Sequence, residues 1–306
     1  MKESIHTYFK VGLISFMAFP ATGKGDAPEM AAVIKKIAQD DYFDAIEISW
    51  TLDEQKRKEI KQYLETSHMT VCYGAFPRLL TTGLNANHLD EAEREKAEKT
   101  LKDAIDEAQY MGSRGMAFLS GKWNPETIEQ SYTQLLKTTR NLCDYARPKG
   151  INIEMELFDH KTAKASLVGP AVLAARFASD IRQTHQNFGL LADLSHIPMN
   201  HESPEFVIRT LRPYLTHFHL GNTVCDDPSA AGYGDEHPRF GFPNGANDTE
   251  QVLNYLRILK QEGFFNKENP YVLSFEIKPW KDEDSDIVIA NAKRVLNRAW
   301  ALLEDR

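Results

Sequence analysis

The sequence predicts one α/β domain over residues 1–306, folded as a single (β/α)8 TIM barrel with a long loop after its seventh strand. Eight short runs rich in β-branched and aromatic residues each precede a segment with helical spacing of its apolar residues. Strict alternation of this kind is typical of parallel strands, and eight such units in 306 residues favour a closed barrel. A doubly wound sheet is the alternative, but residues 21–25, after the first run, contain no GxGxxG phosphate turn. No segment rich in Pro, Gly or Ser divides the chain.

The predicted strands and helices follow one another in order along the chain. The strands cover residues 10–17, 43–50, 69–76, 114–120, 151–158, 188–195, 215–222 and 271–278. The helical segments that follow them cover residues 28–39, 52–66, 89–111, 125–146, 166–184, 203–211, 248–262 and 284–303. Asn124 before Pro125 and Ser203 before Pro204 are typical of helix starts. Gly150 precedes the fifth strand, where a helix C-terminal glycine belongs.

The composition excludes several classes of protein. Hydrophobic residues make up 42% of the chain and charged residues 26%, which is typical of a globular protein, and no apolar run is long enough for a membrane span. Acidic residues outnumber basic ones by 44 to 36 without any Lys/Arg block, so we expect neither nucleic acid nor a membrane as a partner. Cys72, Cys143 and Cys225 form no CxxC, and the first residues lack a signal-peptide pattern. We therefore expect a cytoplasmic protein.

One connection is much longer than the others. Residues 223–247, between the seventh strand and its helix, include a Gly-Tyr-Gly-Asp segment and a His-Pro-Arg-Phe-Gly segment. A loop of this length in a compact domain is usually functional or disordered. Its aromatic residues and the pair His237 and Arg239 predict an ordered active-site lid, and a mobile surface loop is the alternative.

Acidic residues and histidines gather at the ends of four consecutive predicted strands. They are Glu154 and Glu156 on the fifth strand, Asp193 on the sixth, His217 and His219 on the seventh, and Glu276 on the eighth. The active site of a (β/α)8 barrel lies at these ends, and buried carboxylates are costly unless they are paired or bind a metal. One residue from each of the four strands gives three oxygen ligands and one nitrogen ligand, and such a set suits Mn²⁺, Mg²⁺, Co²⁺ or Zn²⁺. Each residue alone could be a core salt-bridge partner or a core histidine, but the ordered set predicts a divalent-metal site.

With these residues in this order, the sequence resembles the xylose-isomerase-like TIM barrels. This superfamily of sugar isomerases and 3-epimerases also contains AP-endonuclease-type barrels. The resemblance extends over essentially the whole chain. It implies one bound divalent ion, for which Mn²⁺ is the first expectation. The implied metal ligands are Glu156, Asp193, His219 and Glu276. Glu156 is preferred to Glu154 because residues 156–159 resemble the family's Glu-x-x-Asn ending, although the choice between the two stays open here.

The family's chemistry assigns roles to these side chains. A metal ion polarises a substrate carbonyl and the neighbouring hydroxyl, which acidifies the C–H bond between them. Glu156 and Glu276 would then remove a proton from one face of the substrate and return it to the other. The resemblance also implies a substrate contact for His196, and Arg239 or His237 would close the site from above. We therefore expect a metal-dependent isomerase or epimerase of a ketose or keto-sugar.

Other strand ends supply predicted substrate-binding residues. These are Glu47, Trp50, Lys122 and His160, with Tyr73, Arg78 and Trp123 as further pocket candidates. Trp50 could stack on a sugar ring or could equally be ordinary packing.

The chain also departs from the common epimerase pattern. Residues 159–161 are polar where epimerases more often have a second Glu, and the loop after the seventh strand is longer. A related branch uses the same site as a lyase that cleaves 3-oxo sugars or 3-oxo C- or O-glycosides by β-elimination, as in the large subunit of C-glycoside deglycosidases. In such a lyase, His160 or His237 would be an additional acid or base. We expect a homo-oligomer or a complex with a small partner subunit.

Two further classes fit less well. An AP-endonuclease-like phosphodiesterase needs more histidines on several strands and a basic groove, but strands two to four end without histidine and the net charge is −8. A non-catalytic binding or scaffold subunit would fit a degenerate metal set, but all four positions are filled.

Overall fold

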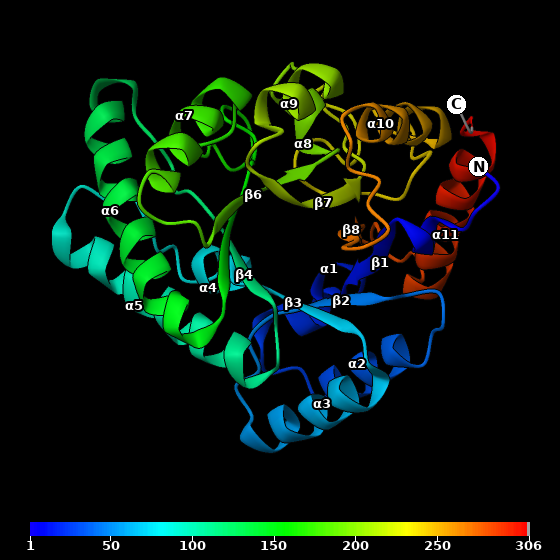
Figure 1. Ribbon diagram of the computed structural model, residues 1–306, viewed down its shortest axis with the longest axis horizontal. Coiled ribbons are helices and arrows are strands. Elements are labelled where there is room, and N and C mark those ends of the chain that lie inside the picture. The colour runs from blue at the N-terminus through cyan, green and yellow to red at the C-terminus, as the bar shows by residue number, and fades with distance from the viewer. Residues whose placement is uncertain (305–306) are drawn as a thin grey trace.

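The predicted barrel is confirmed. Within residues 1–304, which the computed structural model describes, eight parallel strands close into a barrel, with β8 paired to β1 (Figure 1). The strands are β1 Phe9–Ile14, β2 Ala45–Ile48, β3 Thr70–Gly74, β4 Gly115–Leu119, β5 Asn152–Glu156, β6 Phe188–Asp193, β7 Leu215–Gly221 and β8 Tyr271–Glu276. All eight lie inside the predicted β-rich runs, except that β1 begins one residue earlier.

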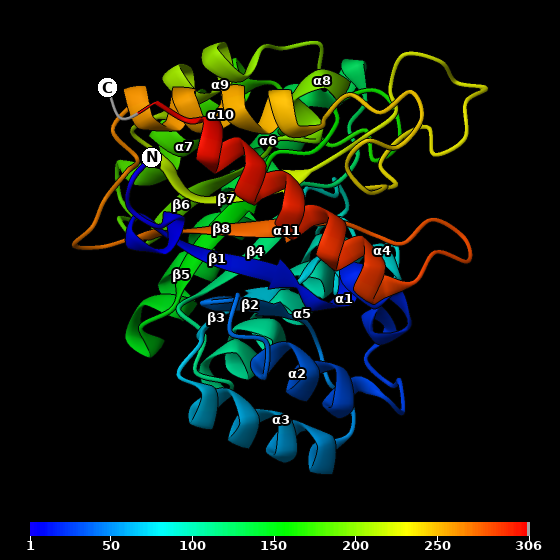
Figure 2. The same cartoon turned by 90° about the vertical axis from the view of Figure 1, so that its right-hand side faces the viewer.

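Helices surround the barrel and cover its outer face (Figures 1 and 2). The main ones are α2 Met30–Ala38, α3 Glu54–Ser67, α5 Glu91–Tyr110, α6 Ile128–Ala146, α7 Ala171–Arg182, α9 Pro204–Leu211, α10 Thr249–Gln261 and α11 Ser285–Leu302. Short helices α1 Ser15–Ala18, α4 Phe76–Leu80 and α8 His196–Met199 follow β1, β3 and β6 directly. Short 3-10 turns cover Ile5–Thr7, Pro20–Lys24, Pro125–Thr127 and Arg147–Lys149.

The local signals explain most of the element boundaries. The Ser203 hydroxyl accepts a hydrogen bond from the backbone N–H of Phe206, which caps α9 as predicted. The predicted helix over residues 166–184 begins later, at Ala171, because Pro170 favours an extended backbone for the residue before it. The predicted first strand ends at Ile14, and the chain then turns into α1 at the carboxyl end of the barrel.

The main hydrophobic core lies between the strands and the surrounding helices, whereas the barrel interior is largely polar. Inside the barrel, Ala45, Cys72 and Val272 form a small apolar cluster separate from the main core. On β2, Glu47 lies two residues after Ala45 and points to the same side of the strand. On β8, Glu276 has the same relation to Ser274. The alternation of the strands therefore carries ionisable side chains into the upper part of the barrel.

The long loop after β7 is folded onto the carboxyl end of the barrel, where Figure 2 shows it in yellow. The Asn222 side chain accepts from the backbone N–H groups of Thr223 and Asn247 and donates to the carbonyl of Arg239. The Asn247 amide donates in turn to the carbonyls of Leu194 and Gly221. Two asparagines thus join both ends of the loop to the barrel, in agreement with the predicted ordered loop.

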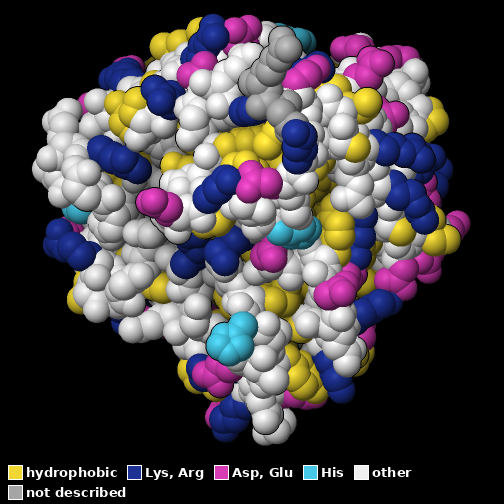
Figure 3. Space-filling view, turned by 45° about the vertical axis from the view of Figure 1, so that its right-hand side comes forward, with side chains coloured by type: hydrophobic (Ala, Val, Ile, Leu, Met, Phe, Trp, Pro, Cys, Tyr) yellow, Lys and Arg dark blue, Asp and Glu magenta, His cyan; other side chains and the backbone are white. Residues whose placement is uncertain are grey.

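Acidic and basic side chains are interspersed on the face drawn in Figure 3. Among the described residues, no helix has both the length and the apolar character needed to cross a membrane.

The close packing of Gly169 against Phe158 and His160, in the loop after β5, can be tested by substitution. A Cβ at residue 169 would collide with the carbonyl oxygen of Phe158 and lie 3.2 Å from Cβ of His160. Since backbone atoms cannot rotate away, we expect Gly169→Ala to lower the free energy of unfolding by about 1–3 kcal/mol in urea denaturation. Gly23→Ala is the control, because its Cβ would meet nothing closer than 3.9 Å. Equal stabilities of the two variants would contradict the packing described.

Candidate active site

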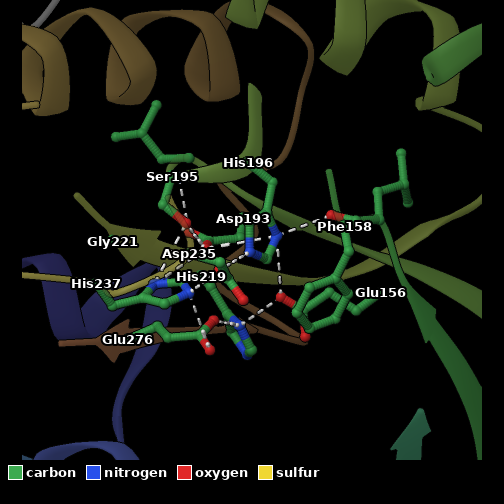
Figure 4. A network of polar contacts seen from close by, with 12 residues as sticks. Glu156, Phe158, Asp193, Ser195, His196, His219, Gly221, Asp235, His237 and Glu276 are labelled. Carbon is green, nitrogen blue, oxygen red and sulfur yellow. Dashed lines mark hydrogen bonds and ion pairs between the residues drawn. The ribbon is translucent and has the colours of Figure 1, made fainter. Parts of the chain in front are cut away.

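Strands β5 to β8 bring four of the predicted residues into one buried group (Figure 4). Glu156, Asp193, His219 and Glu276 are each at most 4% exposed. His219 Nδ1 lies 2.7 Å from Glu276 Oε2 and 3.4 Å from Glu156 Oε1. His196, at the start of α8, joins them, with its Nδ1 at 3.5 Å from Glu156 Oε1 and 3.8 Å from Asp193 Oδ2. The four predicted metal ligands and His196 therefore lie in one buried group, in which His196 connects Asp193 to Glu156.

The loop after β7 completes this group from above. His237 lies with its Nδ1 at 3.7 Å from Asp193 Oδ2 and its Nε2 at 3.7 Å from Glu276 Oε1. Asp235 joins the two histidines, since its Oδ1 is 2.7 Å from His237 Nε2 and 3.0 Å from His196 Nε2. Asp235 was not predicted as a site residue. Its only signal in the sequence is its position two residues before His237. Loop residues have no periodicity that indicates which way a side chain points.

A second loop, after β5, contributes a cation. Lys164 Nζ lies 2.8 Å from Asp235 Oδ2. The buried carboxylate of Asp159 accepts from the backbone N–H groups of Thr162, Lys164 and Ala165, which fixes the turn that carries the lysine. Lys164 was also missed in the sequence, because nothing there pairs the two loops.

Beneath the group, carboxylates and imidazoles alternate down the barrel. His219 Nε2 forms a 3.1 Å hydrogen bond with Glu47 Oε1, and the same oxygen lies 3.1 Å from His217 Nε2. His217 Nδ1 is hydrogen-bonded at 3.1 Å to Glu154, which also accepts from the Thr216 hydroxyl. Glu154 thus lies in the lower layer, and Glu156 is the glutamate of β5 that reaches the group above. We call Glu154, His217 and Glu47 the axial chain.

In the group above the axial chain, Glu156 is the carboxylate whose charged form is disfavoured. Burial raises the pKa of Glu156, and the neighbouring Glu276 carboxylate adds to this, so the pKa is about 7. Burial opposes the charged form of His196, but Asp193 and Asp235 outweigh it and raise the pKa to about 10. Both carboxylate oxygens of Glu156 are buried and lack a hydrogen-bond partner among the described residues. Unpartnered anionic oxygens beside an imidazole nitrogen fit a divalent cation.

Three groups of residues in the described part of the chain have the geometry to hold a metal ion. They are Glu156, His219 and Glu276; Asp193, His196 and His237; and Glu47, His217 and His219. The first two adjoin each other and contain all four predicted ligands.

Comparison with known proteins places the chain in a family. The family model described as xylose isomerase-like TIM barrel matches residues 34–285. The chain belongs to the xylose isomerase-like TIM barrel family. No match emerges from a comparison with curated proteins.

Several solved structures share the fold of this family member at low sequence identity. A D-tagatose 3-epimerase-like protein is 18% identical with a TM-score of 0.70, over 96% of this chain and 99% of that one. The IOLI protein with a bound zinc atom is 17% identical with a TM-score of 0.72, over 97% and 100%. The 3-keto-D-glucoside 4-epimerase YcjR from E. coli is 14% identical with a TM-score of 0.67, over 94% and 99%. At these identities the likeness shows the fold alone.

A cavity of about 310 Å³ opens onto the group in this barrel. Its walls combine apolar side chains of α1, α4 and the segment after β5 with polar side chains of β8 and of the loops after β5, β7 and β8. The lining includes Phe16, Met17, Phe76, Leu80, Phe158, Lys164, Asp235, His237, Glu276 and Lys278. The metal-binding geometry therefore faces a space of ligand size.

The structure does not bring the other predicted residues to this cavity. Arg239 turns away, with its Nε donating to Glu283 at 2.9 Å. His160 stacks on Trp123 at 4.2 Å between ring centroids. Trp50 donates from Nε1 to the carbonyl of Gly23 and packs under the Arg78 guanidinium.

The remaining candidates have other surroundings. Lys122 lines a neighbouring cavity, and Glu47 lies below the group as part of the axial chain. Tyr73 and Arg78 both bond to the buried carboxylate of Glu107 on α5, so they join β3 and α4 to a helix rather than to the cavity.

We expect removal of the Glu47 carboxylate from the axial chain to destabilise the protein strongly. Glu47→Ala would leave the buried His219 without its hydrogen-bonded carboxylate and the buried His217 without an ion-pair neighbour, so we expect the free energy of unfolding to fall by about 3–5 kcal/mol. Glu65→Ala is the control, since Glu65 is exposed and pairs with Lys61 across one helical turn. We expect its effect to stay within about 0.5 kcal/mol. Denaturant titration of both variants measures this, and a stable Glu47→Ala protein would contradict the assigned contacts.

Proposed function

We propose that this barrel is a divalent-metal-dependent isomerase or epimerase of a ketose or keto-sugar. The observation that carries the proposal is the buried group that contains Glu156, Asp193, His219 and Glu276 at the edge of a ligand-sized cavity. The D-tagatose 3-epimerase-like protein and the 3-keto-D-glucoside 4-epimerase, which share the fold, support a sugar as substrate.

The four residues would hold one ion, for which we propose Mn²⁺, and the same set of oxygen and nitrogen donors also suits Mg²⁺, Co²⁺ or Zn²⁺. When bound, the ion polarises the carbonyl and hydroxyl oxygens of the substrate and so acidifies the C–H bond between them. His219 would bind through Nδ1, because its Nε2 is engaged by Glu47.

Two carboxylates would move the proton. Glu156 on β5 and Glu276 on β8 approach His219 from different strands, so one can remove a proton and the other can return one. Transfer to the opposite face of the same carbon gives epimerisation, and transfer to the neighbouring carbon gives isomerisation. His196 has its Nδ1 bonded to the carbonyl of Leu157 at 2.8 Å and its Nε2 at Asp235, so it would orient Asp235 rather than reach freely into the cavity.

Substrate oxygens would then meet other donors. Lys164 and His237 line the cavity on the side of the two loops, and Lys278 lies next to them on the segment after β8. Lysine ammonium and imidazole N–H groups can hold a substrate hydroxyl and an oxyanion in place. Arg239, predicted to close the site, would instead hold the loop through Glu283.

Metal binding provides the first test. Asp193→Asn should weaken Mn²⁺ binding by at least about 100-fold in isothermal titration calorimetry, because a direct ligand is lost and even supporting residues are worth 10–100-fold. Glu283→Gln is the control, since Glu283 bonds to Arg239 and to the backbone of Trp280 away from the group. Retention of Mn²⁺ affinity in Asp193→Asn would remove Asp193 from the ligand set.

Proton exchange provides the second test. Wild-type protein with Mn²⁺ should incorporate deuterium from D₂O next to the carbonyl of a keto-sugar, observed by NMR across ketoses and 3-oxo sugars. Glu276→Gln should slow incorporation by about 10²–10⁴-fold, as expected for loss of a general acid–base residue. Glu65→Gln is the control, because Glu65 is an exposed carboxylate of α3 that pairs with Lys61 away from the cavity. The absence of exchange over the whole panel would count against the proposed function.

The same assay separates the alternative reaction. A lyase acting on a 3-oxo C- or O-glycoside begins with the same proton removal but then expels a leaving group by β-elimination. Release of the aglycone would therefore assign the lyase reaction, and exchange without release would assign the epimerase.

Two further properties stay predictions. They are the assembly, as a homo-oligomer or with a small partner subunit, and the cytoplasmic location.

A further inference from the structure

A second cavity adjoins the site cavity and belongs to none of the machinery described so far. It measures about 440 Å³, against about 310 Å³ for the site cavity. The two cavities share Leu80 and Lys164 in their walls. Lys164 is the lysine that bonds to Asp235 above the metal group, so the second cavity begins directly beside the reacting centre. We call it the side chamber.

The walls of the side chamber are mainly apolar. Leu79, Leu80, Leu84, Leu119 and Ala163 line it, from the segment after β3, the end of β4 and the loop after β5. Leu80 is 46% exposed although it is a large hydrophobic residue. A sugar ring gains little from such walls, whereas an aryl or alkyl group would bury apolar surface that otherwise stays in water.

The polar residues of the lining are Asn85, Ser120, Lys122 and Lys164. The Asn85 amide donates to the carbonyl of Lys122 at 3.4 Å. Lys164 stands at the boundary with the site cavity. A ligand that spans both cavities would thus meet cations and imidazoles at one end and leucines at the other, which fits an amphiphilic molecule rather than a free monosaccharide.

We propose that the side chamber binds an apolar, preferably aromatic, substituent attached to the sugar, so that the substrate is a glycoside-like molecule. This inference rests on the proposed function for the sugar end of the ligand and extends it by naming the substrate class. The site cavity takes the sugar ring, and the wall of Leu79, Leu80, Leu84 and Leu119 takes the substituent.

Ala163 allows the chamber to be filled without disturbing the core. Ala163 lines the chamber and is exposed, so Ala163→Trp adds volume without burying a new side chain in the core. Ala231→Trp is the matched control, because Ala231 is also an exposed loop alanine and lines neither cavity.

The test compares the binding of two stable probes, phenyl β-D-glucoside and methyl β-D-glucoside, to the full chain by titration calorimetry. We expect wild-type protein to bind the phenyl glucoside about 10- to 100-fold more tightly, the gain typical of burying one aromatic group. Ala163→Trp should abolish this preference and leave the affinity for the methyl glucoside unchanged, and Ala231→Trp should retain the preference.

Each outcome decides between the two proposals. Equal or undetectable affinity for the phenyl glucoside in wild-type protein overturns the side-chamber proposal, and so does a preference that survives in Ala163→Trp. Because binding is measured without turnover, a phenyl preference together with no deuterium exchange would overturn the proposed function alone. Exchange without a phenyl preference would overturn the side chamber alone.

Discussion

The structure depends on how buried negative charge is balanced inside the barrel. Each imidazole of β7 lies between two carboxylates, so His217 joins Glu154 to Glu47 and His219 joins Glu47 to the upper group. Ionised carboxylates in such a place are costly unless each finds a partner. In the lower layers each carboxylate has an imidazole neighbour, but Glu47 Oε2 and His217 Nε2 have no hydrogen-bond partner in the described part of the chain. In the top layer both carboxylate oxygens of Glu156 lack such a partner. The least satisfied carboxylate of the barrel therefore lies in the top layer, where the proposed cation would bind.

The two loops above the barrel supply what the strands cannot. Strand alternation places side chains in layers along the axis, but it brings none over the top of the group. Asp235 and Lys164 come from separate loops, and their contact at 2.8 Å joins these loops over the site. The Asp159 carboxylate fixes the loop after β5 by accepting from backbone N–H groups of that loop, and the Asn222 side chain fixes the loop after β7 in the same way. The order of the site is thus a property of buried polar side chains in segments without regular structure.

The sequence predicted the barrel, and it predicted which side chains at the strand ends lie close together, for a physical reason. Parallel strands expose period-2 patterns, and strand ends in a barrel meet at one edge, so Glu156, Asp193, His219 and Glu276 could be placed from order alone. Loop residues have no such periodicity. Asp235 and Lys164 were missed, whereas Arg239 was expected at the site but bonds to Glu283 outside it. Glu47 was expected to face substrate, because a strand-end carboxylate does not reveal how deep in the barrel it lies.

The loop after β7 also has a consequence for how this barrel can diversify. Thr223 and Val224 bond to Gly234 across the base of its outer part, so residues 226–231, which are exposed except for the half-buried Ala230, form a separate outer segment. Insertions, deletions or a fused peptide in that segment would leave Asp235 and His237 where they are. Evolution, or a protein engineer, can thus change the length and chemistry of this rim while the reacting centre beneath it stays intact.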